Sequence, residues 1–165
     1  MPLDDGSFGL REKDAELPIP HRGFRASLPR SGSDVFGFRV ADGFAIQVHE
    51  VGLEGEGHVE SRAIAYARPG GTSYWSANER GYEEWLSLES GVAVADHAAA
   101  TWEIAGGRAS ETPDGVDILD ETGRPRIHVS VPASYAASGR LVDARLQVHG
   151  ATIELWAAPI TAHAS

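Results

Sequence analysis

The sequence predicts an all-β fold, namely a sandwich of the jelly-roll or immunoglobulin-like kind with roughly nine or ten short strands. From residue 35 onward, short runs alternate apolar and polar residues with the two-residue period of a half-buried strand. Turns rich in Gly, Pro and Asp separate these runs at the spacing typical of sandwiches and barrels. One Ala-rich stretch, residues 92–100, is either a short helix or an irregular crossover.

Residues 1–34 lack this alternation and contain four of the nine prolines of the chain. We therefore expect an extended, Pro/Gly-rich N-terminal arm that lies against its own sandwich or against a neighbouring subunit. We assign residues 35–160 to a single sandwich domain and residues 161–165 to a C-terminal tail. A chain of 165 residues is long enough for one such domain to bury a core.

Turn residues fix the limits of the expected strands. Asp42-Gly43 and Gly150-Ala151 each separate two alternating runs, which is the pattern of a tight hairpin. Residues 52–57 are expected to form a glycine-rich turn. In chain order, the expected strands lie at residues 35–40, 44–51, 59–67, 74–76, 82–88, 101–104, 115–119, 127–131, 141–149 and 152–156.

Composition excludes several classes of partner and cofactor. The formal net charge of −10 argues against nucleic acid and against an anionic membrane surface, which both require clustered Lys and Arg. The absence of cysteine excludes disulfides, zinc–thiolate sites and iron–sulfur clusters. No apolar run is long enough to cross a membrane, so we expect no membrane insertion.

The N-terminus is acidic and lacks the apolar segment of a signal peptide. If the chain is native and complete, we expect a cytoplasmic protein. If it is a fragment of a secreted protein, we expect an extracellular or cell-surface location.

The window from Thr72 to Leu88 is the strongest candidate for a ligand site, because it holds half of the Tyr and half of the Trp residues. Aromatic faces beside carboxylates and an amide are typical of sugar-binding sites, since flat apolar rings stack and polar groups fix orientation. The alternative is that alternate aromatic residues of this window fill the core. The candidate ligand-binding residues are Tyr74, Trp75, Asn78, Tyr82, Glu83 and Trp85.

An enzymatic interpretation depends on four carboxylates, which are Glu79, Glu83, Glu84 and Glu89. A glycoside hydrolase needs two carboxylates at a defined separation across one bond. Glu83 and Glu84 are adjacent, so on a strand they point to opposite faces and cannot serve one bond together. The chain also lacks a GxSxG elbow and a phosphate-binding glycine loop. We therefore expect no enzymatic activity.

Two groups of residues are weak candidates for metal binding. Asp114, Asp117 and Asp120 surround a turn and carry the oxygen ligands that calcium prefers, but their spacing does not match an EF-hand loop. His49, His128 and His149 lie on expected strands and could converge in the folded chain. We predict no resident cofactor, with a surface calcium ion as the alternative.

Two segments of the chain carry a family resemblance that covers residues from about 23 to 155. The first runs through Ala65–Arg68, Tyr74–Asn78 and Gly81–Leu86, and the second through Asp117–Arg124, Ala144–Leu146 and Ile153–Leu155. In these segments the chain resembles a poorly characterised β-rich module of GC-rich bacteria such as myxobacteria. That module lies near the N-terminus of large secreted or surface proteins, ahead of FG-GAP or RHS-type repeats. The resemblance implies a non-enzymatic extracellular module that serves as a scaffold or in adhesion.

These observations together predict a non-enzymatic module for binding or assembly. The first hypothesis is a structural or adhesive subunit that self-associates through its N-terminal arm or its edge strands, with itself or a surface protein as partner. The second hypothesis is a carbohydrate-binding module that uses the aromatic surface between Tyr74 and Trp85. A glycoside-active enzyme is the third.

Overall fold

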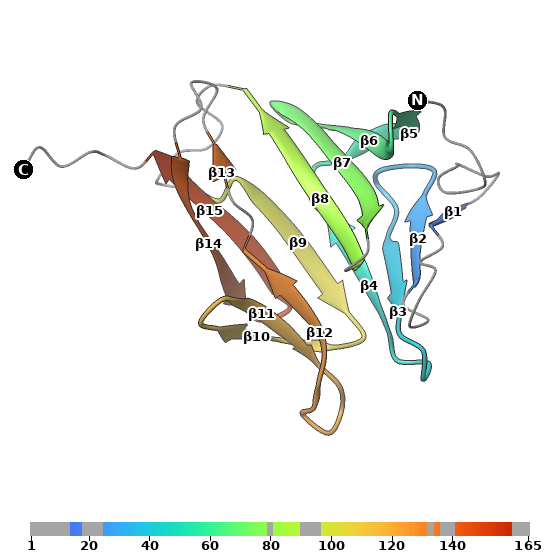
Figure 1. Cartoon of the computed structure of the whole chain (residues 1–165), viewed down its shortest axis with the longest axis vertical. Coiled ribbons are helices and arrows are strands. Elements are labelled where there is room, and N and C mark those ends of the chain that lie inside the picture. The colour runs from blue at the N-terminus through green and yellow to red at the C-terminus, as the bar shows by residue number, and fades with distance from the viewer. Residues whose placement is uncertain are drawn as a thin grey trace, which may run out of the picture.

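In a computed structural model of the chain, the described residues are 14–17, 25–78, 81–89, 97–131, 134–135 and 141–159. Every regular element among them is a β-strand, so the predicted all-β class is confirmed (Figure 1). The fifteen strands exceed the predicted number because several short edge strands were not recognised. They are β1 (Asp14–Leu17), β2 (Arg25–Pro29), β3 (Phe36–Arg39), β4 (Ala45–Glu50), β5 (Glu54–Glu60), β6 (Ala63–Arg68), β7 (Gly71–Asn78), β8 (Gly81–Leu88), β9 (Ala100–Ala105), β10 (Arg108–Thr112), β11 (Gly115–Leu119), β12 (Pro125–Ser130), β13 (Ser134–Tyr135), β14 (Leu141–His149) and β15 (Thr152–Pro159).

The strands form three antiparallel sheets that make up two layers. The large sheet has the order β1-β2-β3-β4-β9-β15-β14-β13. The second layer consists of two smaller sheets, β5-β6-β7-β8 and β10-β11-β12. In Figure 1 the four-stranded sheet lies at the upper end of the molecule, beside β2 to β4, and the three-stranded sheet lies at the lower end, beside β14. The predicted sandwich therefore has a split second layer.

The core lies between the layers and follows from the alternation within each strand. Phe36 is paired with Val48, and Val48 with Ile104, so one face of the large sheet is continuously apolar. The smaller sheets cover this face with their own buried residues, including Tyr66 and Ile118. The ring centroids of Phe36 and Tyr66 lie 5.3 Å apart, which is the edge-to-face spacing of a favourable aromatic pair.

Residues 25–34 belong to the sandwich, although the sequence analysis assigned them to the N-terminal arm. Strand β2 pairs with β3, and Leu28 is 0% exposed. The Tyr66 hydroxyl donates a 2.5 Å hydrogen bond to the Pro29 carbonyl, which ties β2 to the second layer. Strand β1 pairs with β2 of the same chain. The short alternation in β2 was missed because turn-forming residues surround it.

The segment expected to be a glycine-rich turn contains most of strand β5. Strands β5 and β6 form a hairpin across Ser61, which has a positive φ of 56°, where one longer strand had been expected. Gly57 is required by packing, because a Cβ atom there would lie 2.5 Å from the Tyr66 ring. Glycine is tolerated here because β5 is an edge strand with an irregular register. Strand β10 was likewise not predicted.

The two predicted tight hairpins are confirmed. Asp42-Gly43 connects β3 to β4, and Gly150-Ala151 connects β14 to β15. Gly43 and Gly150 have φ values of 98° and 59°, which favour glycine. Most of the Ala-rich stretch 92–100 and all of the tail 161–165 lie outside the described residues, and Ala100 opens β9. Within the described ranges, no helix is long and apolar enough to span a membrane.

Candidate functional site

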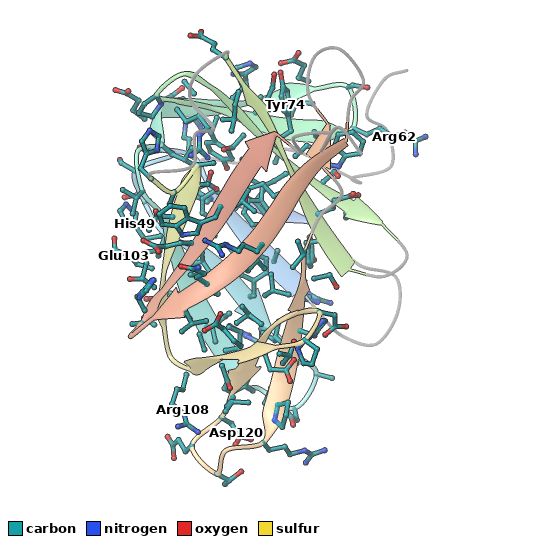
Figure 2. The ribbon with its side chains drawn as sticks, turned by 90° about the vertical axis from the view of Figure 1, so that its left-hand side faces the viewer. His49, Arg62, Tyr74, Glu103, Arg108 and Asp120 are labelled. Carbon is teal, nitrogen blue, oxygen red and sulfur yellow. The ribbon has the colours of Figure 1, made fainter. Side chains whose placement is uncertain are left out.

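The β7–β8 hairpin divides the aromatic window between the two faces of the four-stranded sheet. Tyr74 of β7 lies directly opposite Trp85 of β8, and both are on the outer face. Trp85 is 61% exposed, the largest exposure among the large hydrophobic residues that the structure describes. Directly paired side chains share a face and lie close enough to interact. The structure therefore places an exposed Trp85 beside a half-buried Tyr74 on the outer face (Tyr74 in Figure 2).

Polar residues flank this pair on the same two strands. Ser76 is paired with Glu83 on one side, and Thr72 with Ser87 on the other. We call the six residues Thr72, Tyr74, Ser76, Glu83, Trp85 and Ser87 the aromatic platform. On the neighbouring strand β6, Ala65 lies opposite Tyr74 and is 0% exposed. The platform thus places hydroxyl and carboxylate groups beside two rings on one face of the sheet.

Two members of the predicted ligand set belong to the core instead. Trp75 is 8% exposed, and its ring centroid lies 5.0 Å from that of Phe36. The ring centroids of Tyr82 and Phe38 lie 5.9 Å apart. The Tyr82 hydroxyl accepts a 2.8 Å hydrogen bond from the backbone N–H of Ala26. Trp75 and Tyr82 therefore hold the two layers together and do not contribute to the platform. The alternative that alternate aromatics of the window fill the core holds for these two residues.

Asn78 is the last residue of β7 and pairs with Gly81 in the strand register. Its side chain lies outside the described part of the structure, as does Glu79. Of the predicted ligand residues, the structure therefore brings together Tyr74, Glu83 and Trp85.

A buried polar network that the sequence analysis did not identify lies beneath the hairpin. Glu50 of β4 is 0% exposed and accepts hydrogen bonds from three side chains. Arg68 Nη1 and Ser73 Oγ donate to Glu50 Oε2 at 2.8 and 2.5 Å, respectively. Trp75 Nε1 donates to Glu50 Oε1 at 3.3 Å. Arg68 Nη2 also donates to the Ala99 carbonyl at 3.0 Å. The carboxylate is thus paired and hydrogen-bonded, as a buried charge must be.

Glu84 of β8 reaches the same network from the second layer. Trp102 Nε1 donates a 2.9 Å hydrogen bond to Glu84 Oε1, whereas Glu84 Oε2 is buried without a donor. Burial raises the pKa of Glu84 well above its ordinary value, and the nearby Glu50 carboxylate raises it further. A protonated Glu84 can donate its own hydrogen to Glu50, which satisfies the second oxygen. The predicted opposite orientation of Glu83 and Glu84 is confirmed, since Glu83 is exposed.

A signal for this network was present in the sequence. Alternation in β4 placed Glu50 on the same face as Ile46 and Val48, which are both in the core. A charged residue at an inward position requires a buried partner. The partner itself could not be predicted, because Arg68 and Glu84 lie on strands of a different sheet.

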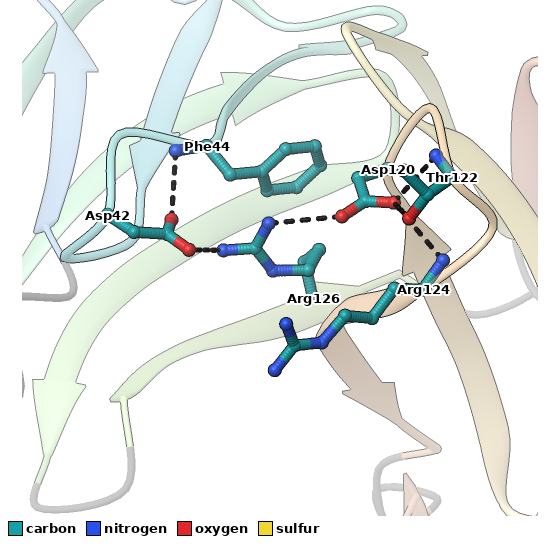
Figure 3. A network of polar contacts seen from close by, with 6 residues as sticks. All are labelled: Asp42, Phe44, Asp120, Thr122, Arg124 and Arg126. Carbon is teal, nitrogen blue, oxygen red and sulfur yellow. Dashed lines mark hydrogen bonds and ion pairs between the residues drawn. The ribbon is translucent and has the colours of Figure 1, made fainter.

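The acidic turn residues do not converge on a common point. His128 Nδ1 lies 2.6 Å from Asp117 Oδ1, and His128 Nε2 lies 3.6 Å from Asp114 Oδ2. Asp120 instead accepts hydrogen bonds from Thr122 and from Arg126 (Figure 3). Hydrogen bonds from Thr122, followed by those from Arg124 and Arg126, hold the pKa of Asp120 well below its ordinary value. No three carboxylates or imidazoles in the described ranges are arranged to hold a metal ion.

The strand histidines also remain apart. His49 Nδ1 pairs with Glu103 Oε1 at 2.8 Å on the outer face of the large sheet (Figure 2). His149 Nε2 pairs with Glu154 Oε1 at 3.1 Å, and His128 lies on the separate three-stranded sheet. Each imidazole therefore has its own carboxylate partner, and the three do not form one site.

Comparisons with protein families, with curated proteins and with solved structures find no match for this chain.

Proposed function

We propose that this chain is a non-enzymatic binding module and that the aromatic platform binds carbohydrate. The observation that carries this proposal is Trp85, which is 61% exposed and directly paired with Tyr74 on the outer face of the four-stranded sheet. The exposed ring of Trp85 offers apolar area that a ligand can cover. Flat ring faces stack on the apolar faces of sugar rings, while neighbouring polar groups bind hydroxyls.

Charge favours a neutral glycan over an acidic one. Glu83 is exposed on the platform, and Glu60 lies on the same face at strand β5, where its carboxylate is 3.6 Å from His58 Nε2 and its side chain is 55% exposed. The chain as a whole carries a net charge of −10. A uronic or sialic acid would meet like charge at this surface, whereas neutral hydroxyls can donate to the carboxylates.

A glycan-screening experiment with fluorescence titration of tryptophan tests the proposal. Neutral oligosaccharides should change the fluorescence of the wild-type chain, and Trp85→Ala should abolish that response. The matched control is Trp156→Ala, which removes a Trp from β15 in the large sheet, away from the platform. A response that survives in Trp85→Ala, or the absence of any response from the wild-type chain, would contradict the proposal.

Self-association is the second candidate function, and strand β8 favours it. Strand β8 ends the four-stranded sheet and pairs with β7 alone among the described strands. An exposed edge strand can accept a strand from another chain. The N-terminal arm is a weaker candidate for the self-association contact, because β1 pairs with β2 of its own chain.

Light scattering after size exclusion, over a wide range of dilutions, tests whether the chain self-associates. Deletion of residues 1–17 removes β1 and is the appropriate truncation, since deletion of residues 1–34 would also remove the core strand β2.

A further inference from the structure

Strand β8 presents the ligand face and the buried acid network on its two opposite sides. Glu83 and Trp85 belong to the platform, and Glu84 between them points into the molecule. A displacement of the backbone at Glu84 therefore also displaces platform residues, because the three are consecutive on one strand.

Beneath β8, the network contains two carboxyl groups and one guanidinium. Glu50 accepts hydrogen bonds from Arg68 Nη1, Ser73 and Trp75, whereas Arg68 Nε and Glu84 Oε2 are both buried without a hydrogen-bond partner. With one proton on the carboxyl pair, the network is neutral and Glu84 Oε2 has a partner in Glu50. Without that proton, the buried network carries one uncompensated negative charge, and Oε2 has no donor.

We propose that Glu50 and Glu84 share one proton that fastens β8 to the large sheet, and that loss of this proton loosens β8 and weakens ligand binding on the aromatic platform. The second half of this inference rests on the proposed function, whereas the proton-dependent position of β8 does not.

The groups that face Glu84 support this coupling. The charged groups are Glu50 from β4 and Arg68 from β6, while β9 contributes the neutral donor Trp102. Burial is the largest cause that raises the pKa of Glu84, and the charge of Glu50 acts in the same direction against the opposing effect of Arg68. The proton is therefore retained above the ordinary pKa of a glutamic acid and is lost as the pH rises through the raised value.

The edge position of β8 explains why this strand, and not β4, would respond. Strand β4 is held between β3 and β9 in the middle of the large sheet, whereas β8 pairs with β7 alone in the described part of the chain. We therefore expect two like charges in this buried site to displace β8, which has fewer pairing neighbours, more readily than β4.

Backbone hydrogen exchange of β8 across a pH series, in the full chain, tests the proton-dependent part. Protection is expressed relative to β3 in the same sample, because the intrinsic exchange rate itself rises with pH. The protection of β8 in the wild-type chain should fall as the pH rises, whereas in Glu84→Gln it should stay constant relative to β3.

The Glu84→Gln variant should fold, because the glutamine amide can still accept a hydrogen bond from Trp102 and donate one to Glu50. Glu89→Gln, which changes the exposed carboxylate directly after β8 and outside the platform, should keep the wild-type behaviour. Equal pH dependence in the wild type and Glu84→Gln would overturn the inference.

Oligosaccharide titration at the same pH values separates this inference from the proposed function. If the affinity for neutral glycans falls several-fold with rising pH in the wild type, but not in Glu84→Gln, the result supports both this inference and the proposed function. Glycan binding that does not depend on pH, with constant protection of β8, overturns the inference and leaves the proposed function intact. A pH-dependent β8 in a chain that binds no glycan at any pH supports the shared proton and contradicts the proposed function.

Discussion

Glu50 shows how a single inward charge organises the residues around it. Three side chains from two strands of the second layer donate to its carboxylate, and it is fully buried among them. Removing one partner of a buried ion pair leaves the other as an uncompensated charge, which costs much more than the pair itself contributes. The network therefore fixes how the four-stranded sheet sits on β4 and β9.

Glu50→Gln should destabilise the fold strongly, because the buried Arg68 guanidinium would lose the carboxylate to which it donates at 2.8 Å. We expect a loss of about 3–5 kcal/mol in the free energy of unfolding, which is the usual cost of breaking a buried pair. Urea denaturation followed by tryptophan fluorescence measures this loss. The control is Glu103→Gln, which breaks the exposed contact with His49 and should cost about 1 kcal/mol or less. Similar costs for the two variants would show that the buried pair has no special role.

At the scale of elements, the sequence predicted those strands whose turns carry a strong local signal. Asp42-Gly43 and Gly150-Ala151 identified two hairpins, because glycine is favoured at the positive φ angles that these turns contain. Strand β2 was missed because its alternation is short, and β5 because its glycines indicate a turn when read alone. The glycine at position 57 is explained by the packing of the Tyr66 ring against it within the folded sheet. This contact joins residues on different strands, so the local sequence of β5 does not reveal it.

The candidate site was predicted in part for a similar reason. Alternation separates Trp75 from Tyr74, and Tyr82 from Trp85, once the limits of the two strands are known. Which of the two faces is buried depends on the opposing sheet, and Phe36 and Phe38 of that sheet cover Trp75 and Tyr82. Local sequence could therefore identify two pairs of aromatic residues, but not which pair is exposed.

Two turns from different sheets are joined by Arg126, and this connection should weaken in acid. Arg126 donates to Asp42 in the β3–β4 turn and to Asp120 in the β11–β12 turn (Figure 3). Hydrogen bonding lowers the pKa of Asp120, chiefly through Thr122, and that of Asp42, chiefly through the Phe44 backbone. A carboxyl group whose pKa is lowered in the folded state stabilises the fold above its ordinary pKa. That stabilisation is lost as the pH falls toward the lowered value.

Asp120→Asn should therefore be less stable than the wild-type chain at neutral pH, with a difference that shrinks as the pH falls below the ordinary aspartate pKa of 3.8. Denaturant unfolding at a series of pH values measures this difference. Glu121→Gln, which alters the adjacent exposed carboxylate in the same turn, serves as the control. A deficit of Asp120→Asn that stays constant with pH would mean that the charge of Asp120 does not contribute.

At the scale of the whole molecule, alternation predicted two packed layers but not the division of the second layer. Both small sheets lie on one apolar face of the eight-stranded sheet, and their order depends on pairings between distant segments, such as β4 with β9. The division places the aromatic platform and Asp120 toward opposite ends of the molecule (Figure 2). A ligand on the platform therefore does not contact the acidic turn, and the charges of that turn affect the ligand only through long-range electrostatics.

That field gives a prediction about salt. The net charge of −10 and the nearby Glu60 and Glu83 should repel an acidic oligosaccharide, and dissolved ions should screen this repulsion. At low ionic strength we expect the acidic glycan to bind several-fold more weakly than a neutral one of the same backbone. Added salt should reduce this difference in affinity, because it strengthens the binding of the acidic glycan and leaves that of the neutral glycan unchanged. Calorimetric titration of both glycans at low and high salt measures the effect, and Glu83→Gln should reduce the gap at low salt. Tighter binding of the acidic glycan at low salt would instead show that the surface around Trp85 is effectively cationic, which would contradict the charge argument for a neutral ligand.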